Sequence, residues 1–225
     1  MENLPIYISI VFALTTLLTV GIFYSAASNS KTTLLILLVW LGLQTFIGLS
    51  GFYTVTDTIP PRFLLLILPP LLLIIILFTT LKGRQYIDSL DIKTLTLLHT
   101  VRIPVELVLF WLSVNKAVPE LMTFEGRNLD ILSGLTAPFI FYFGFIKKSL
   151  NKKVILFWNF ICTGLLLNIV INAILSAPFP FQQFAFDQPN IAVLHFPFNW
   201  LPSCVVPLVL FSHLASIRQL LNNGK

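Results

Sequence analysis

Charged side chains are scarce in this chain, and their scarcity decides its class. Only 10% of the 225 residues are charged and 56% are hydrophobic, with a mean hydropathy of +0.90. Soluble domains carry about 25% charged residues, so the composition excludes an ordinary soluble protein and indicates an integral membrane protein. The length leaves no room for a sizeable soluble domain beside the membrane helices.

Cysteine and histidine are also rare. The two cysteines, Cys162 and Cys204, lie inside apolar segments, which argues against an extracellular disulfide framework. Three histidines without a located further ligand make no case for a metal, so we predict neither a metal nor a cofactor. A phosphate-binding loop and zinc-protease motifs are absent as well.

Long hydrophobic runs are abundant instead. A membrane-spanning helix needs about 20 residues to cross about 30 Å of hydrocarbon, and seven stretches meet this requirement. We therefore predict an all-α bundle of seven transmembrane helices forming one domain over residues 1–225. The expected helices are 5–26, 33–53, 63–81, 93–115, 129–146, 154–175 and 191–216. The last of these contains no lysine, which excludes a retinal Schiff base.

The basic residues predict the orientation of the bundle. Positively charged residues gather in cytoplasmic loops, and with the N-terminus outside they divide ten to three in favour of the cytoplasm. The cytoplasmic set is Lys31, Lys82, Arg84, Lys93, Lys147, Lys148, Lys152, Lys153, Arg218 and Lys225; the outer set is Arg62, Lys116 and Arg127. We expect an outer N-terminus and a cytoplasmic C-terminus. This distribution also explains the net charge of +5 without a nucleic-acid partner.

The expected helix 93–115 carries an unusual polar stripe. His99, Arg102 and Glu106 fall within about 60° of one another on a helix. Ionisable residues within a membrane are costly to insert and usually functional, so the stripe is the first candidate for a ligand site. The alternative is an ion pair between Arg102 and Glu106, four residues apart, that only holds the helices together.

Polar residues on two later helices are further ligand-binding candidates. Asn168 and Asn172 are four residues apart and would complete a shell around the stripe if their helix faces it; otherwise they bind a neighbouring helix. His195 and Asn199 share a face of the expected helix 191–216. His213 lies eighteen residues after His195, about 27 Å along a helix, so these two cannot share a metal, but His213 and His99 are expected to approach each other.

Prolines also mark the last expected helix as bent or locally unwound. Pro197, Pro202 and Pro207 are spaced five residues apart. Broken helices at membrane depth are tolerated where they line a cavity or pack on another helix. We interpret this segment as a candidate pocket wall, with a static kink as the alternative.

The outer loop 116–130 holds the densest charge in the chain. Glu125, Arg127 and Asp130 are candidates for a gate over an outward-facing pocket. In the alternative interpretation, Asn128 caps the next helix and Asp130 complements the positive end of that helix.

These observations favour a small transporter, or a ligand-binding or sensing protein, that recognises a small solute through the polar stripe. In this interpretation a small anion pairs with Arg102, or a proton resides on Glu106. The runner-up is an intramembrane enzyme acting on a lipid-like substrate with His99 or His195 as acid–base, so enzymatic activity stays open. A third alternative is an accessory subunit that uses the stripe to bind a membrane partner or another copy. The absence of Asn-x-Ser/Thr acceptor sites favours a bacterial inner membrane.

Overall fold

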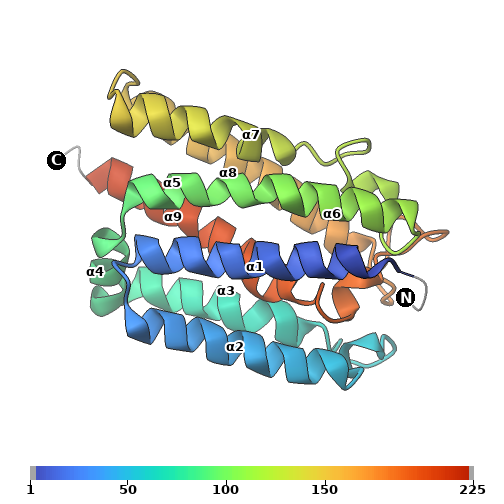
Figure 1. Ribbon diagram of the computed structural model, residues 1–225. Helices are drawn as coiled ribbons and strands as arrows, with labels where there is room; N and C mark the ends of the chain where they lie inside the picture. The colour runs from blue at the N-terminus through green and yellow to red at the C-terminus, as the bar shows by residue number, and fades with distance from the viewer. Residues whose placement is uncertain (1–3, 223–225) are drawn as a thin grey trace.

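The computed structural model describes residues 4–222, which form an all-α bundle (Figure 1). Within this range there is no strand, and the predicted all-α fold is confirmed. The helices are α1 (Ile6–Ala26), α2 (Lys31–Leu49), α3 (Leu64–Thr79), α4 (Leu81–Ser89), α5 (Ile92–Leu98), α6 (Arg102–Val114), α7 (Ile131–Ile140), α8 (Lys152–Leu175) and α9 (Val206–Asn222). A π-helical turn, Phe141–Ile146, extends α7, and another, Leu201–Val205, precedes α9.

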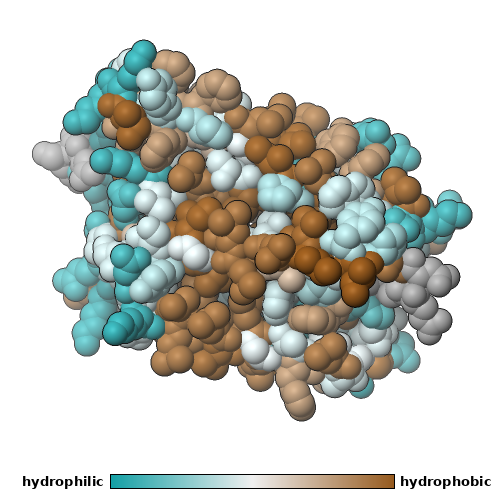
Figure 2. Space-filling model, viewed as in Figure 1, coloured by the Kyte–Doolittle hydropathy of each residue, from teal (hydrophilic) through white to brown (hydrophobic). Residues whose placement is uncertain are grey.

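Several of these helices are long and apolar enough to cross a membrane. Five segments of the described chain meet both criteria: α1, α2, α5 joined to α6, α8, and α9 with its preceding turn. A sixth is obtained if α3 and α4, which meet at 95°, count as one broken span, while Ile131–Ile146 is apolar but shorter. Figure 2 shows hydrophobic side chains across the middle of one face, with hydrophilic ones gathered towards both ends. The arrangement is that expected of a membrane protein.

Burial differs strongly between the helices. In the most apolar part of the span that contains α9, 67% of the residues are buried, against 17% in the corresponding part of α2. The helix α9 packs on α8 and α5, whereas α2 lies at the edge of the bundle (Figure 1). A helix that is apolar on all sides and exposed needs an apolar solvent, so α2 is suited to contact lipid.

The helix α4 turns sharply away from α3 at one end of the bundle. The Thr80 hydroxyl accepts from the backbone N–H of Gly83, which caps α4. Gly83 packs so closely on α3 that a Cβ there would collide with the Leu77 backbone. Arg218 of α9 then holds the other end of α4, donating to both carboxylate oxygens of Asp88 at 2.9 and 3.0 Å.

The expected last helix is wrong at both ends. The helix was predicted over 191–216, but the structure has a π-helical turn from Leu201 that leads into α9, which extends to Asn222. The cause at the N-terminal end is Pro197, which lacks an N–H donor and disfavours helical backbone in the residue before it. Residues 195–199 therefore form turns that pack beside α2, where Asn199 donates to the Gln44 carbonyl.

Candidate functional site

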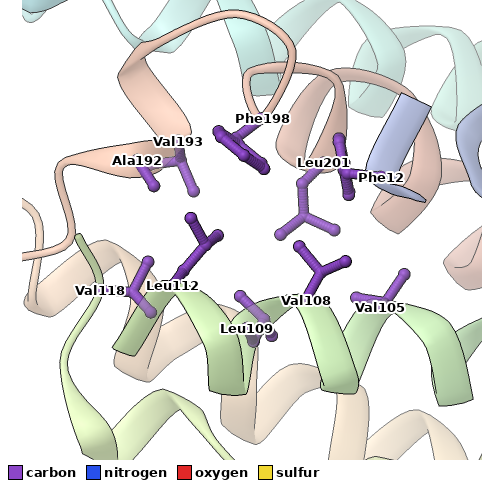
Figure 3. Close-up of a pocket in the computed structure, with 10 residues that line it drawn as sticks. All are labelled: Phe12, Val105, Val108, Leu109, Leu112, Val118, Ala192, Val193, Phe198 and Leu201. Atoms are coloured by element: carbon purple, nitrogen blue, oxygen red, sulfur yellow. The ribbon is translucent and has the colours of Figure 1, made fainter. Parts of the chain in front are cut away.

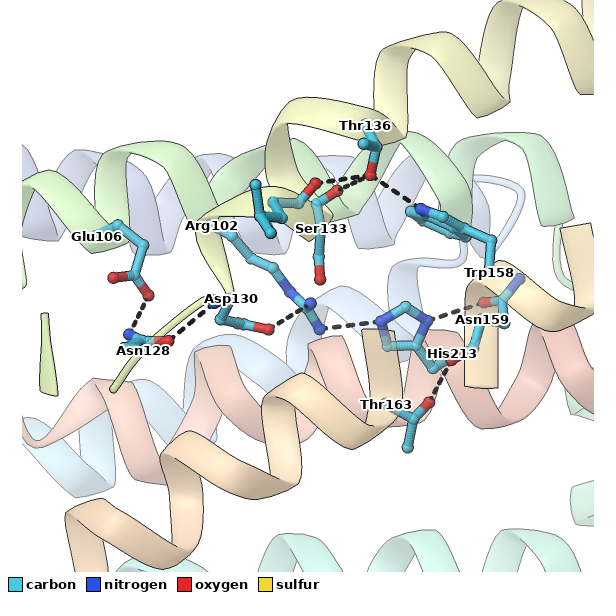
Figure 4. A network of polar contacts seen from close by, with 11 residues as sticks. Arg102, Glu106, Asn128, Asp130, Ser133, Thr136, Trp158, Asn159, Thr163 and His213 are labelled. Atoms are coloured by element: carbon cyan, nitrogen blue, oxygen red, sulfur yellow. Dashed lines mark hydrogen bonds and ion pairs between the residues drawn. The ribbon is translucent and has the colours of Figure 1, made fainter. Parts of the chain in front are cut away.

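The centre of the polar network is an ion pair between α6 and the start of α7 (Figure 4). Arg102 Nη1 lies 2.7 Å from Asp130 Oδ1, and the two side chains are 3% and 6% exposed. The proposed pairing of Arg102 with Glu106 is therefore wrong. Asp130 directly precedes the first residue of α7, at the positive end of that helix as the capping interpretation expected, and its carboxylate binds Arg102. A carboxylate from a neighbouring segment reaches the guanidinium more directly than one four residues along the same helix.

His213 binds the other terminal nitrogen of the Arg102 guanidinium. Arg102 Nη2 lies 2.9 Å from His213 Nε2, and because arginine only donates hydrogen bonds, Nε2 must be the acceptor. The imidazole is then neutral with its proton on Nδ1, which donates to Asn159 Oδ1 at 2.8 Å. The Asn159 amide nitrogen donates to the Ile155 carbonyl, which fixes the amide orientation. Three helices, α6, α8 and α9, are thus joined through one chain of bonds.

His99 packs against this chain without joining it. Its ring stacks on His213 with centroids 3.7 Å apart, so the expected approach of the two histidines is confirmed. Trp158 meets both rings edge-on and donates its N–H to Thr136 at 2.9 Å. His99 is fully buried, and neither ring nitrogen has a hydrogen-bond partner among the described residues. In this position the ring contributes packing rather than pairing.

Glu106 lies one turn further along α6 and is only half partnered. The Asn128 amide donates to Glu106 Oε1 and to the Met122 carbonyl, while its own oxygen accepts from the Asp130 backbone N–H. Asn128 therefore fastens the outer loop to α6 and positions Asp130 opposite Arg102. The second oxygen, Glu106 Oε2, has no partner in the described chain, and the residue is 2% exposed. A buried carboxylate oxygen left in this way is costly unless it is protonated or receives a donor.

A cavity of about 210 Å³ adjoins Glu106. It is lined mainly by apolar side chains of α3, α6, α8 and α9, and its polar lining residues are Glu106, Asp130 and Asn190. Pro202 and Pro207 also line it, in agreement with the interpretation of this segment as a pocket wall. Asn190 is 1% exposed, and its side-chain oxygen likewise has no partner in the described chain. Leu167, 46% exposed, lies at the rim.

The other side of α6 is closed. Figure 3 shows apolar side chains from four parts of the chain around a void of about 10 Å³, among them Val108 and Leu112 of α6, with Phe12 and Phe198 opposite. An apolar void with room for about one water molecule stays dry. The binding capacity of α6 is therefore confined to the side that carries Glu106.

Comparison with known families places most of this architecture in one group. Residues 59–221 match the model of a family described as a domain of unknown function (DUF8737). The chain belongs to this family. No curated protein and no solved structure matches the chain.

The DUF8737 segment includes the whole polar network and every residue that lines the 210 Å³ cavity. It also includes Asn168 and Asn172, which the structure does not bring to the stripe. Asn168 is exposed and donates to the Arg127 carbonyl, and Asn172 donates to Asn168. Asn159, nine residues before Asn168, is on the opposite face of α8, about two and a half turns away, and it makes the contact expected of the other two.

The remaining candidates are also separate from the network. Asn199 is buried and donates to the Gln44 carbonyl at 2.7 Å, which joins the DUF8737 segment to α2 outside it. Tyr53 donates to Gln44 Oε1 at 2.6 Å, and burial raises the pKa of Tyr53 to about 12, so the phenol stays protonated. His195 is half-buried in the turns of residues 195–199, and burial lowers its pKa.

The three gate candidates do not form one group. Glu125 and Arg127 are exposed, whereas Asp130 is buried against Arg102. Sequence reasoning missed Asn128, Asn159 and Asn190 as partners of the site. A polar residue within an apolar helix was the available signal for Asn159, but nothing comparable marks the loop residues. In the described chain, no group of three His, Cys, Asp or Glu side chains is placed to hold a metal ion.

Proposed function

We propose that the protein crosses a bacterial inner membrane seven times, with its N-terminus outside and its C-terminus in the cytoplasm. The five long spans, the bent α3–α4 pair and the short Ile131–Ile146 segment supply seven apolar passes. The ten-to-three distribution of basic residues supports the orientation. Reporter fusions at the loop 147–151 and at the C-terminus test this topology; both are expected to report the cytoplasmic side, and an outer location of either overturns it.

We further propose that the protein binds a small, largely apolar molecule in the 210 Å³ cavity, as a transporter or a sensor. The observation that carries this proposal is Glu106, whose unpartnered Oε2 belongs to a residue lining an otherwise apolar cavity. Apolar pockets with a few placed polar groups are the usual form of small-ligand sites. Charged residues deep in a membrane protein are retained mainly for function.

The position of the cavity indicates how a ligand reaches it. Leu167 lines the cavity and is also exposed, so it lies where α8 faces away from the bundle and would contact the hydrocarbon of the membrane. Lateral entry from the bilayer suits an apolar or amphiphilic molecule better than an inorganic anion. An anion at Arg102 is also disfavoured, because Asp130 and His213 occupy both Nη groups.

The two competing functions receive less support. An acid–base enzyme would benefit from a histidine paired with a carboxylate, and no such pair occurs within residues 4–222. An accessory subunit that binds a partner through the stripe would present it outward. Instead His99, Arg102 and Glu106 are at most 3% exposed.

The test is photolabelling with 3-butyl-3-methyldiazirine, a small apolar probe, in lipid nanodiscs, with adducts located by mass spectrometry. We expect saturable labelling at cavity residues of α3, α8 and α9, and non-saturable labelling at lipid-facing α2. Val170→Phe fills the cavity and should abolish the saturable part. Ile171→Phe, one residue further on α8 and 55% exposed, is the matched control and should not. Labelling that is non-saturable everywhere overturns the proposal.

A further inference from the structure

The unpartnered polar atoms around the 210 Å³ cavity are all of one kind. Within the described chain, the lining side chains contribute two such atoms, Glu106 Oε2 and Asn190 Oδ1. Both are oxygens, and both accept hydrogen bonds when Glu106 is ionised. The donor groups of these two residues are used elsewhere or do not exist: the Asn190 amide nitrogen donates to the Ala173 carbonyl, and an ionised carboxylate has none.

The nearest cation does not change this property. Arg102 is absent from the cavity lining, and both of its Nη groups are bound to Asp130 and His213. Two carboxyl groups, Glu106 and Asp130, line the cavity, whereas Arg102 supplies one positive charge. With both carboxyl groups ionised, the local balance is one negative charge in excess, which one proton or one cationic group neutralises.

We infer that the cavity binds an amphiphile with a short apolar chain and a hydrogen-bond-donating head group, an ammonium or a hydroxyl, held by Glu106. This inference rests on the proposed ligand-binding function and names the class of ligand. A donor head group satisfies the unpaired oxygen of Glu106, and a cationic one also balances its charge. A carboxylate head group would place an acceptor and a like charge against Glu106.

The size of the cavity limits the chain. At about 30 Å³ for a group the size of water, a volume of about 210 Å³ holds about seven non-hydrogen atoms. Heptylamine and heptanol have eight non-hydrogen atoms and heptanoate has nine, which is close to this number. All three have seven carbon atoms and carry different head groups, so they are suitable probes. A longer lipid chain with the same head group would enter from the bilayer through the rim at Leu167.

Competition against the saturable diazirine labelling described above tests the inference. The free concentration of each competitor in the membrane is matched by measured partitioning. We expect heptylamine and heptanol to compete at concentrations at least tenfold lower than heptanoate. The Glu106→Gln protein presents an amide N–H to the cavity, which a hydroxyl accepts but an ammonium does not. In this variant the concentration of heptylamine needed to compete should rise at least tenfold, whereas that of heptanol should change by less than about threefold.

The outcomes separate the two proposals. Absence of saturable labelling in the unmodified protein overturns the proposed function itself. Saturable labelling that heptanoate displaces as well as heptylamine leaves the function standing and overturns the head-group inference. Equal competition by heptylamine in the unmodified protein and in Glu106→Gln also overturns it.

Discussion

Arg102 and Glu106 lie one turn apart on the same helix, and both are at most 3% exposed, but their surroundings differ. Arg102 has a carboxylate and an imidazole on its two Nη groups. Glu106 has one amide donor on one oxygen and a cavity beside it. Side chains from two other segments of the chain bind Arg102, whereas only the outer loop reaches Glu106.

The difference separates two uses of a buried charge. A buried ion pair needs its other bonds satisfied if it is to offset the loss of hydration. Both Nη groups of Arg102 meet this condition, although its Nε has no partner in the described chain. Glu106 does not meet it, so its retention is better explained by a ligand or a proton than by packing. We therefore expect substitutions near Arg102 to affect folding and substitutions at Glu106 to affect binding.

The largest effect is expected from breaking the ion pair. Asp130→Ala leaves Arg102 buried without a counter-charge, which should lower the free energy of unfolding by about 3–5 kcal/mol. Unfolding by SDS titration in mixed micelles measures it. The matched control is Asp88→Ala, which breaks the partly exposed pair with Arg218 and should change stability by at most about 1 kcal/mol. Similar losses for both variants would contradict the role assigned to Asp130.

A smaller loss is expected at His213. His213→Phe keeps a ring stacked on His99 but leaves Arg102 Nη2 and the Asn159 oxygen unpaired, and should lower unfolding free energy by about 2–3 kcal/mol. The same titration measures it. His195→Phe is the control, since His195 is half-buried and makes no side-chain hydrogen bond within the described residues; it should change stability little. If His213→Phe leaves the free energy of unfolding unchanged, the imidazole does not pair with Arg102.

The next largest effect on stability is expected from the close packing of α7 against α6. A Cβ at Gly134 would lie 3.0 Å from the Ile103 side chain and 3.2 Å from Arg102 Cβ, so Gly134→Ala should destabilise by about 1–2 kcal/mol through overpacking. Gly164 on α8 has open space around it, and Gly164→Ala should instead stabilise its helix by about 0.5–1 kcal/mol. Opposite signs in the two titrations are the expected result; equal signs would refute the close packing at Gly134.

The smallest effect on folding is expected at Glu106. Glu106→Gln keeps an oxygen that accepts from Asn128 and removes a buried charge, so stability should change by less than about 1 kcal/mol or increase. The same variant should nevertheless change binding in the cavity. A loss as large as that of Asp130→Ala would show that Glu106 belongs to the folding network and would remove the contrast between the two residues.

Much of the fold could be predicted because the membrane restricts it. Apolar runs of sufficient length predict most helices at nearly the right positions. The last helix departs at both ends, with Pro197 interrupting its start, and the short helix α4 was not predicted. The stripe of His99, Arg102 and Glu106 was visible from helical spacing alone, as was the approach of His99 to His213. Its partners were not visible, because Asp130 and Asn159 are 28 and 57 residues from Arg102 in the chain.

The sequence by itself determined the all-α class, the apolar spans and the presence of buried charge, because each follows from local composition and the period of one helix. The tertiary structure alone decided which carboxylate Arg102 binds, which asparagine reaches His213 and where the cavity lies. Those contacts depend on how α6, α7, α8 and α9 pack around one another. The spacing of residues within any single helix does not encode that packing.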